Sequence, residues 1–214
     1  GLLSAYMGNV LTEWNRFEEA IDLIKPAVAR CKQGRDVTSL GLCYTFLLRA
    51  YQAKGDPERA RETLDHLKAL TDERGVPPLL DYWRIASEAQ FWIAQGKLDL
   101  ASQVLESQLD AVDRDSSPYL HEPLQLSRIR LLIARGDADE ALDRLTAERC
   151  KARHAMRRTR RIELLVLSAL AHGVKGDQAR AVAYLDQALT LAEPEGYVRV
   201  FTYKGAKLVP LLRA

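Results

Sequence analysis

The sequence predicts an all-α fold: an open right-handed α-α superhelix of about five antiparallel helical hairpins, tetratricopeptide-like, with a repeat of about 40 residues. Small turn residues recur at separations of 40, 41, 40 and 40 residues, at Asn15, Gly55, Gly96, Gly136 and Gly176. Five positions after each turn residue stands an alanine: Ala20, Ala60, Ala101, Ala141 and Ala181. Four positions later comes a branched aliphatic residue: Ile24, Leu64, Leu105, Leu145 and Leu185. A period held this closely is the signature of stacked repeats.

The second unit shows the pattern of each repeat most clearly. Apolar residues at three- and four-residue steps between Leu40 and Tyr51 mark the buried face of one helix. Gly55-Asp56-Pro57 then ends that helix and begins its partner, because glycine suits the left-handed position and aspartate caps the next helix. We interpret Ala60 as small because the two helices approach closely just past the turn.

The other units follow the same pattern, with a degenerate turn around Asn15 in the first. Pro26 falls inside the second helix of that unit, where we expect it to kink or break the helix. The loops between hairpins are too short for a domain linker, so residues 1–192 are predicted to form one repeat domain. Residues 193–214 are predicted to close it, with a turn, a short extended segment over 197–203 and a final helix over 206–213.

Composition directs the search for function towards binding. The 31 basic and 29 acidic side chains leave a net charge of +2, which excludes a global basic field for nucleic acid. Cys31, Cys43 and Cys150 show no metal-ligand spacing, and we interpret them as buried thiols in a reducing compartment. No apolar run is long enough to cross a membrane, and the apolar start Gly1-Leu2-Leu3 suggests a piece of a longer cytoplasmic protein.

Aligning the repeats on their turns gives a candidate ligand site. Six residues before each turn residue stand Asn9, Arg49, Gln90, Arg130 and Leu170, of which four are polar. We call these four the polar ladder, and we expect them on the concave face, with Arg84 beside the aromatic residues Tyr82, Trp83, Phe91 and Trp92. Two interpretations stay open: a ligand site, or solvated helix edges beside an aromatic core.

A second candidate is an arginine cluster formed by Arg149, Arg153, Arg157, Arg158, Arg160 and Arg161. It lies in a stretch that contains no acidic residue, and its first three members are four residues apart, as on one helix face. Such a cluster suits phosphate, nucleic acid or an acidic partner, although a solvated surface run would look the same.

Catalytic motifs are absent from the sequence. It contains no phosphate-binding loop, GxGxxG, HExxH or GxSxG pattern, and its histidines have no metal-ligand spacing. His172 stands at a position that is usually apolar, so we expect a core histidine. We therefore predict that the chain is no enzyme and that it holds no metal and no cofactor.

The end of the repeat array carries a more specific pattern. The stretch Leu189 to Phe201, followed by Gly205 and by Leu208 to Leu212, resembles the segment that closes the superhelical region of MalT-type LuxR-family transcriptional regulators. Leu11 to Ala20 is similar to a recurrent turn of the same region.

The resemblance implies a bacterial activator with an N-terminal ATP-binding module and a C-terminal DNA-binding helix-turn-helix. This chain would then be its sensor for a small-molecule effector or a partner protein. One alternative is a tetratricopeptide-like scaffold that binds a peptide or protein in its groove. Another is direct nucleic-acid binding through the arginine cluster.

Overall fold

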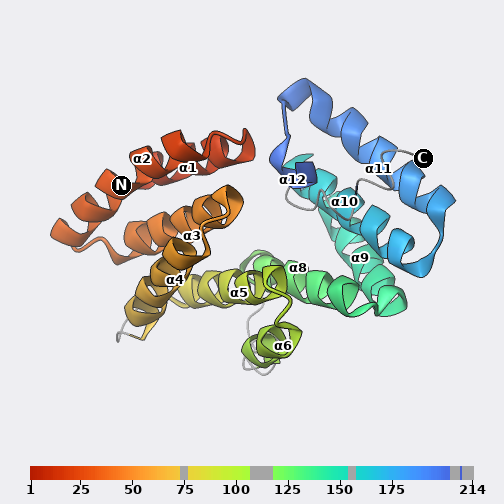
Figure 1. The fold of residues 1–214 in the computed structure, drawn as a ribbon, viewed down its shortest axis with the longest axis horizontal. Helices are drawn as coiled ribbons and strands as arrows, with labels where there is room; N and C mark the ends of the chain where they lie inside the picture. Colours follow the sequence, from red (N-terminus) through yellow and green to blue (C-terminus); the bar gives the residue numbers. More distant parts are fainter. Residues whose placement is uncertain (73–76, 107–117, 154–157, 203–207, 209–214) are drawn as a thin grey trace. The chain divides into compact units, whose positions relative to one another are not determined.

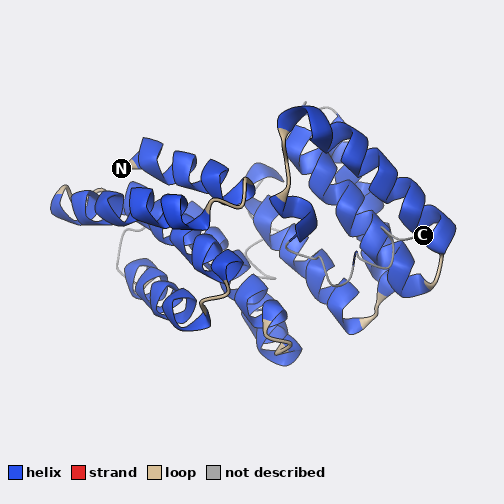
Figure 2. Ribbon diagram, turned by 45° about the horizontal axis from the view of Figure 1, so that its top comes forward, coloured by secondary structure: helices blue, strands red, loops and turns tan. Residues whose placement is uncertain are grey.

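The computed structural model describes residues 1–72, 77–106, 118–153, 158–202 and 208. Within these ranges the chain forms helices joined by short turns and no strand, as Figure 2 shows. The α-helices, labelled in Figure 1, are α1 (Leu2–Glu13), α2 (Phe17–Gln33), α3 (Val37–Lys54), α4 (Pro57–Thr71), α5 (Pro78–Ala94), α6 (Leu98–Glu106), α8 (Pro118–Arg135), α9 (Ala138–Arg153), α10 (Arg158–Lys175), α11 (Gln178–Ala192) and α12 (Arg199–Thr202). A 3-10 turn, η1 (Glu193–Glu195), lies between α11 and α12. The predicted all-α repeat fold is confirmed.

The chain divides into two compact units, Gly1–Ser127 and Arg128–Ala214, and the division falls inside α8. In the first unit α1 packs on both α2 and α3, and α3 packs in turn on α4 and α5. In the second unit α10 packs on both α9 and α11. The assignment of residues 1–192 to a single domain stays a prediction.

All five turn residues adopt the left-handed backbone conformation that their positions require. Their φ angles are 60° at Asn15, 80° at Gly55, 73° at Gly96, 97° at Gly136 and 84° at Gly176. No atom lies near the position that a Cβ would occupy at any of the four glycines, so the backbone conformation rather than crowding favours glycine there. The predicted cap after Gly55 is also present, because Asp56 accepts a hydrogen bond of 3.1 Å from the Arg59 N–H.

The repeated alanines form the centre of each hairpin. Ala20, Ala60, Ala101, Ala141 and Ala181 are all completely buried. The aliphatic residue four positions later is buried in every repeat as well, from fully in Ile24 to 3% exposed in Leu105. The tight turn therefore brings two helices together over a methyl group.

Replacing Ala60 with leucine tests this close approach. We expect Ala60→Leu to lower the free energy of unfolding by about 1–3 kcal/mol, because added methylenes in a packed core force neighbours apart. The matched control is Ala29→Leu, at an exposed position of α2, which should change stability little. Urea unfolding followed by circular dichroism measures both, and equal stability of the two variants would contradict the packing role.

Two sequence-based expectations need correction. The break expected at Pro26 is absent, and α2 runs through that residue as one helix; a kink there stays a prediction. Pro26 leaves the Asp22 carbonyl without its helical donor, but both residues are exposed, so water can hydrate that carbonyl. The segment expected to be extended contains the short helix α12 over Arg199–Thr202, reached through a left-handed turn at Gly196 with a φ of 66°. The expected final helix over 206–213 lies outside the described residues except for Leu208, which is helical and buried.

One face of α1 exposes a continuous apolar stripe. Leu3 is 85% exposed, Tyr6 48%, Met7 53% and Val10 39%. Aligned on the turns, these four positions correspond to Cys43, Phe46, Leu47 and Ala50 of α3, all of which are at most 8% exposed. The aligned positions are therefore buried in α3 and exposed to solvent in α1.

Alanine substitutions at one aligned position in α1 and α3 measure how much the difference in burial contributes to stability. We expect Leu47→Ala to cost about 2–5 kcal/mol in free energy of unfolding, because it opens a cavity in a packed core. Met7→Ala, at the aligned position of α1, should cost well under 1 kcal/mol because the side chain is half exposed. Thermal unfolding measures the loss of stability in both variants. An equal loss for Met7→Ala and Leu47→Ala would show that the stripe is covered in solution.

Candidate functional site

The first two members of the polar ladder hydrogen-bond to each other. Arg49 on α3 donates through Nη1 to Oδ1 of Asn9 on α1, at 2.9 Å, and through Nη2 to Oε1 of Glu13, at 2.6 Å. The two guanidinium nitrogens thus join neighbouring helices of the first unit, and Arg49 stays 41% exposed.

The remaining members are also paired, but not with one another. Gln90 donates to Oγ of the fully buried Ser127, at 3.3 Å, and Arg130 forms an ion pair with Glu163 of α10. The ladder residues therefore connect helices of successive repeats. Their role in ligand binding stays a prediction, and a ligand at these side chains would have to compete with the internal contacts.

Arg84 lies in an ionic network on α5. It hydrogen-bonds Asp81 at 2.8 Å and the buried Glu88 at 3.1 Å, and Glu88 also accepts from Lys68 of α4 at 2.7 Å. The neighbouring aromatic side chains Tyr82, Phe91 and Trp92 are buried. Of the two open interpretations, the core interpretation is confirmed for these three aromatic residues.

A largely buried charge cluster joins α8, α9 and α10 within the second unit. Glu163 pairs with Arg130, and its second oxygen lies 3.7 Å from Arg160. Arg160, 7% exposed, also donates to Glu148 of α9 at 3.3 Å. The cluster balances two arginines with two glutamates, which limits the cost of burying the four charges.

Removing one carboxylate from the cluster should reveal the free-energy cost of burying an arginine without its counter-charge. We expect Glu163→Ala to lower the free energy of unfolding by about 3 kcal/mol, because Arg130 is left buried without a counter-charge. The matched control is Glu140→Ala, whose carboxylate pairs with Arg144 on the exposed surface of α9 and should contribute at most about 0.5 kcal/mol. Chemical unfolding of both variants gives the comparison, and similar losses would contradict the role of burial.

The arginine cluster does not form one continuous surface. Arg160 is buried in the charge cluster, whereas Arg158 and Arg161 are exposed. Arg149 is half-buried on α9. The Arg153 side chain and the whole of Arg157 lie outside the described residues. The structure thus separates Arg160 from the exposed members, and anion binding by the others stays a prediction.

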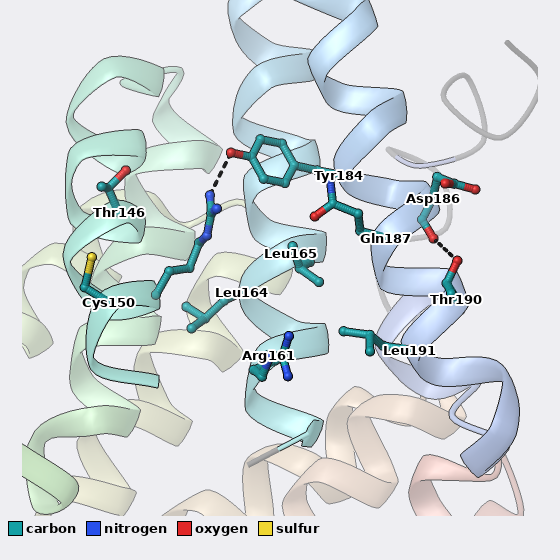
Figure 3. Close-up of a pocket in the computed structure, with 11 residues that line it drawn as sticks. Thr146, Cys150, Arg161, Leu164, Leu165, Tyr184, Asp186, Gln187, Thr190 and Leu191 are labelled. Carbon is teal, nitrogen blue, oxygen red and sulfur yellow. Dashed lines mark hydrogen bonds between the residues drawn. The ribbon is translucent and has the colours of Figure 1, made fainter. Parts of the chain in front are cut away.

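Arg149 and Arg161 share a pocket in the second unit. The pocket has a volume of about 650 Å³ and lies between α9 and α11, with α10 behind them. Its lining comprises Thr146, Arg149, Cys150, Arg161, Leu164, Leu165, Tyr184, Asp186, Gln187, Thr190 and Leu191, and Figure 3 shows how these side chains lie. A volume of this size suits a small organic ligand.

One wall of the pocket is held in place by stacked and hydrogen-bonded groups. Arg149 donates through Nη1 to the Tyr184 hydroxyl at 2.7 Å, the dashed line at Tyr184 in Figure 3. Its guanidinium carbon also lies 4.8 Å from the centre of the Tyr184 ring. On α10 the buried His172 stacks on the same ring, with 5.3 Å between the ring centres and 15° between the planes. This layer connects all three helices that line the pocket.

Cys150 corrects the expectation that all three cysteines are buried. Cys31 and Cys43 are buried, and this burial together with the neighbouring Cys31 thiol raises the pKa of Cys43 to about 12. Cys150 is exposed in the pocket lining. The interpretation as core thiols failed there because the Cys150 side chain lies on the open side of α9. Its thiol is a natural reporter for occupancy of the pocket.

His172 behaves as the predicted core histidine. Its side chain is 8% exposed, and its Nδ1 atom lies 3.6 Å from the Asp177 carboxylate without a hydrogen bond. Burial lowers the pKa of His172; Asp177 opposes this shift, whereas Arg180, Lys175 and Arg149 reinforce it. The folded chain therefore favours the neutral imidazole.

Stability should consequently depend on pH through His172. Below the ordinary pKa of about 6.5, the unfolded chain takes up the proton before the folded chain does, so stability falls as pH decreases. We expect His172→Phe to reduce the loss of stability between pH 7.5 and pH 5.5, measured as the shift in urea midpoint. The control is His66→Phe, at a half-exposed histidine. The same midpoint shift in wild type and His172→Phe would contradict the role of burial.

The sequence does contain a signal for the pocket. It lies in the second helix of each hairpin, whereas the polar ladder was found by aligning only the helices that precede the turns. Eight residues after the turns stand Leu23, Thr63, Val104, Arg144 and Tyr184. Tyr184 is the single aromatic residue in this series and the one on which the wall of the pocket depends. Aligning the second helices of the hairpins as well would have identified it.

Two other kinds of site do not occur among the described residues. Within the described ranges, no group of three or more histidine, cysteine or acidic side chains is placed to hold a metal ion. No helix in this part of the chain has the length and apolar character needed to span a membrane.

Comparison with known proteins identifies the family. A family model described as the MalT-like TPR region matches residues 1–214, so the chain belongs to this family of tetratricopeptide-like repeats. No curated protein matches the sequence significantly. The match covers both compact units, including the closing segment after Leu191.

Proposed function

We propose that this chain is the effector-sensing and protein-interaction region of a bacterial LuxR-family transcriptional regulator and carries no catalysis of its own. The observation that carries the proposal is the match of the whole chain to the MalT-like TPR region. In such a regulator, the region works in the cytoplasm alongside an ATP-binding module and a DNA-binding helix-turn-helix. Contact with DNA belongs to that helix-turn-helix and not to this chain.

The pocket between α9, α10 and α11 supports reception of a small molecule. Its lining combines apolar side chains with polar and charged groups that could orient a ligand. A ligand that fills it contacts three helices at once and so favours one spacing of α9 and α11 over others. Differential affinity for two such arrangements would shift the regulator between resting and active states.

A thermal-shift screen of small metabolites tests effector binding. A ligand that binds only the folded chain must raise its melting temperature, by an amount that grows with concentration. We expect at least one compound to do so, and we expect Thr190→Trp, which places an indole in the pocket, to abolish the shift. The control Ala183→Trp changes an exposed position of the same helix outside the pocket lining and should retain the shift.

Two results would contradict the proposal. If no compound raises the melting temperature while a peptide or partner protein does, the chain is a scaffold and not an effector sensor. If the gene encodes neither a phosphate-binding loop nor a helix-turn-helix in the same reading frame, the assignment to a regulator of this type is wrong.

A further inference from the structure

In the part of the chain that the structure describes, the two arginines of the pocket lack the carboxylate partners that the arginines of the polar ladder, the α5 network and the charge cluster have. Arg49, Arg84, Arg130 and Arg160 each pair with at least one carboxylate. Arg149 and Arg161 line the pocket, and within the described residues no carboxylate lies at ion-pair distance from either one. We propose that these two arginines receive the acidic group of a small organic anion, an inference that rests on the proposed function and specifies its ligand class.

Arg149 is prepared for this role by its surroundings. The hydrogen bond to Tyr184 uses Nη1, and no acceptor among the described residues engages Nε or Nη2, so these N–H donors can serve a ligand. The ring contact with Tyr184 and the stack on the buried His172 hold the guanidinium in one orientation. Little side-chain freedom is then lost on binding, which raises the affinity for an acceptor of matching geometry.

Arg161 supplies the second positive charge from α10. It is exposed and has no hydrogen-bond or ion-pair partner among the described residues. The one acidic residue of the lining, Asp186, lies on α11, and Figure 3 shows its carboxylate pointing away from Arg161. The space between the two arginines therefore carries a net positive charge.

The remaining lining selects the body of the ligand. Leu165 and Leu191 offer an apolar surface with the fully buried Leu164 beside them, and Gln187 adds an amide (Figure 3). A carboxylate or phosphate attached to an apolar body can use both parts of the pocket, whereas inorganic phosphate can use the arginines alone. Apolar contact and charge-assisted hydrogen bonds should contribute together.

The exposed thiol of Cys150 provides the test. The rate of its modification by a maleimide is measured on the full chain in the presence of hexanoate, hexan-1-ol, 4-phenylbutyrate, 4-phenylbutan-1-ol, inorganic phosphate and a short RNA oligonucleotide. Cys31 and Cys43 are buried and serve as internal references for intact folding. We expect the two carboxylates to slow modification at least fivefold more than their uncharged alcohols and more than phosphate does.

Charge-removing variants locate the effect. Arg161→Gln should weaken protection by the carboxylates about tenfold or more, which corresponds to the loss of a charge-assisted hydrogen bond. The matched control Lys25→Gln removes an exposed cation from α2 in the other unit and should leave protection unchanged. Melting temperatures of both variants without ligand establish that they remain folded.

The possible outcomes are distinct. If acids and alcohols protect the Cys150 thiol equally, and Arg161→Gln does not change this protection, the arginines do not recognise the charge. The pocket would then suit a neutral effector. Protection by phosphate as strong as by 4-phenylbutyrate would overturn the role of the apolar wall. Protection by an RNA oligonucleotide alone, lost steeply with salt, would overturn the proposal in favour of nucleic-acid binding. No protection by any probe would overturn the anion site, while the metabolite screen still tests the proposed function by itself.

Discussion

The close approach of two helices immediately after a left-handed turn is the constraint on which this structure depends. The turn residue reverses the chain, and the alanine five positions later is completely buried in every repeat. Because this arrangement recurs, the aliphatic side chains that follow reach equivalent places in the core. Side chains at one aligned position therefore take equivalent places within their own hairpins, although the stripe on α1 shows that their burial can differ between repeats.

Much of the fold could be predicted because it depends on local geometry. The left-handed turns, the aspartate cap before α4 and the buried alanines each follow from a few consecutive residues. The errors arose where surroundings outweigh local preference. Pro26 sits on a hydrated face where a lost hydrogen bond costs little, and the alternating residues of α12 coil into a helical turn.

The candidate site was less predictable because its residues come from different helices. Spacing alone placed Arg160 with its arginine neighbours, although the fold buries it against Glu148 and Glu163. The exposure of Cys150 and the layer of Arg149, Tyr184 and His172 depend on the packing of α9, α10 and α11. Sequence periodicity identifies which positions are equivalent, but it does not show which of them find a partner across the interface.

The apolar stripe on α1 has a consequence for the order in which the first unit opens. In a linear array, each hairpin is stabilised by its own packing and by the interfaces with its neighbours. The hairpin of α3 and α4 has such an interface on both sides, with α1 and with α5, whereas α1 leaves the corresponding stripe exposed to solvent. Wherever that stripe is left uncovered, α1 and α2 have one packed interface fewer than α3 and α4, so amide hydrogens in α1 and α2 should exchange earlier than those in α3 and α4.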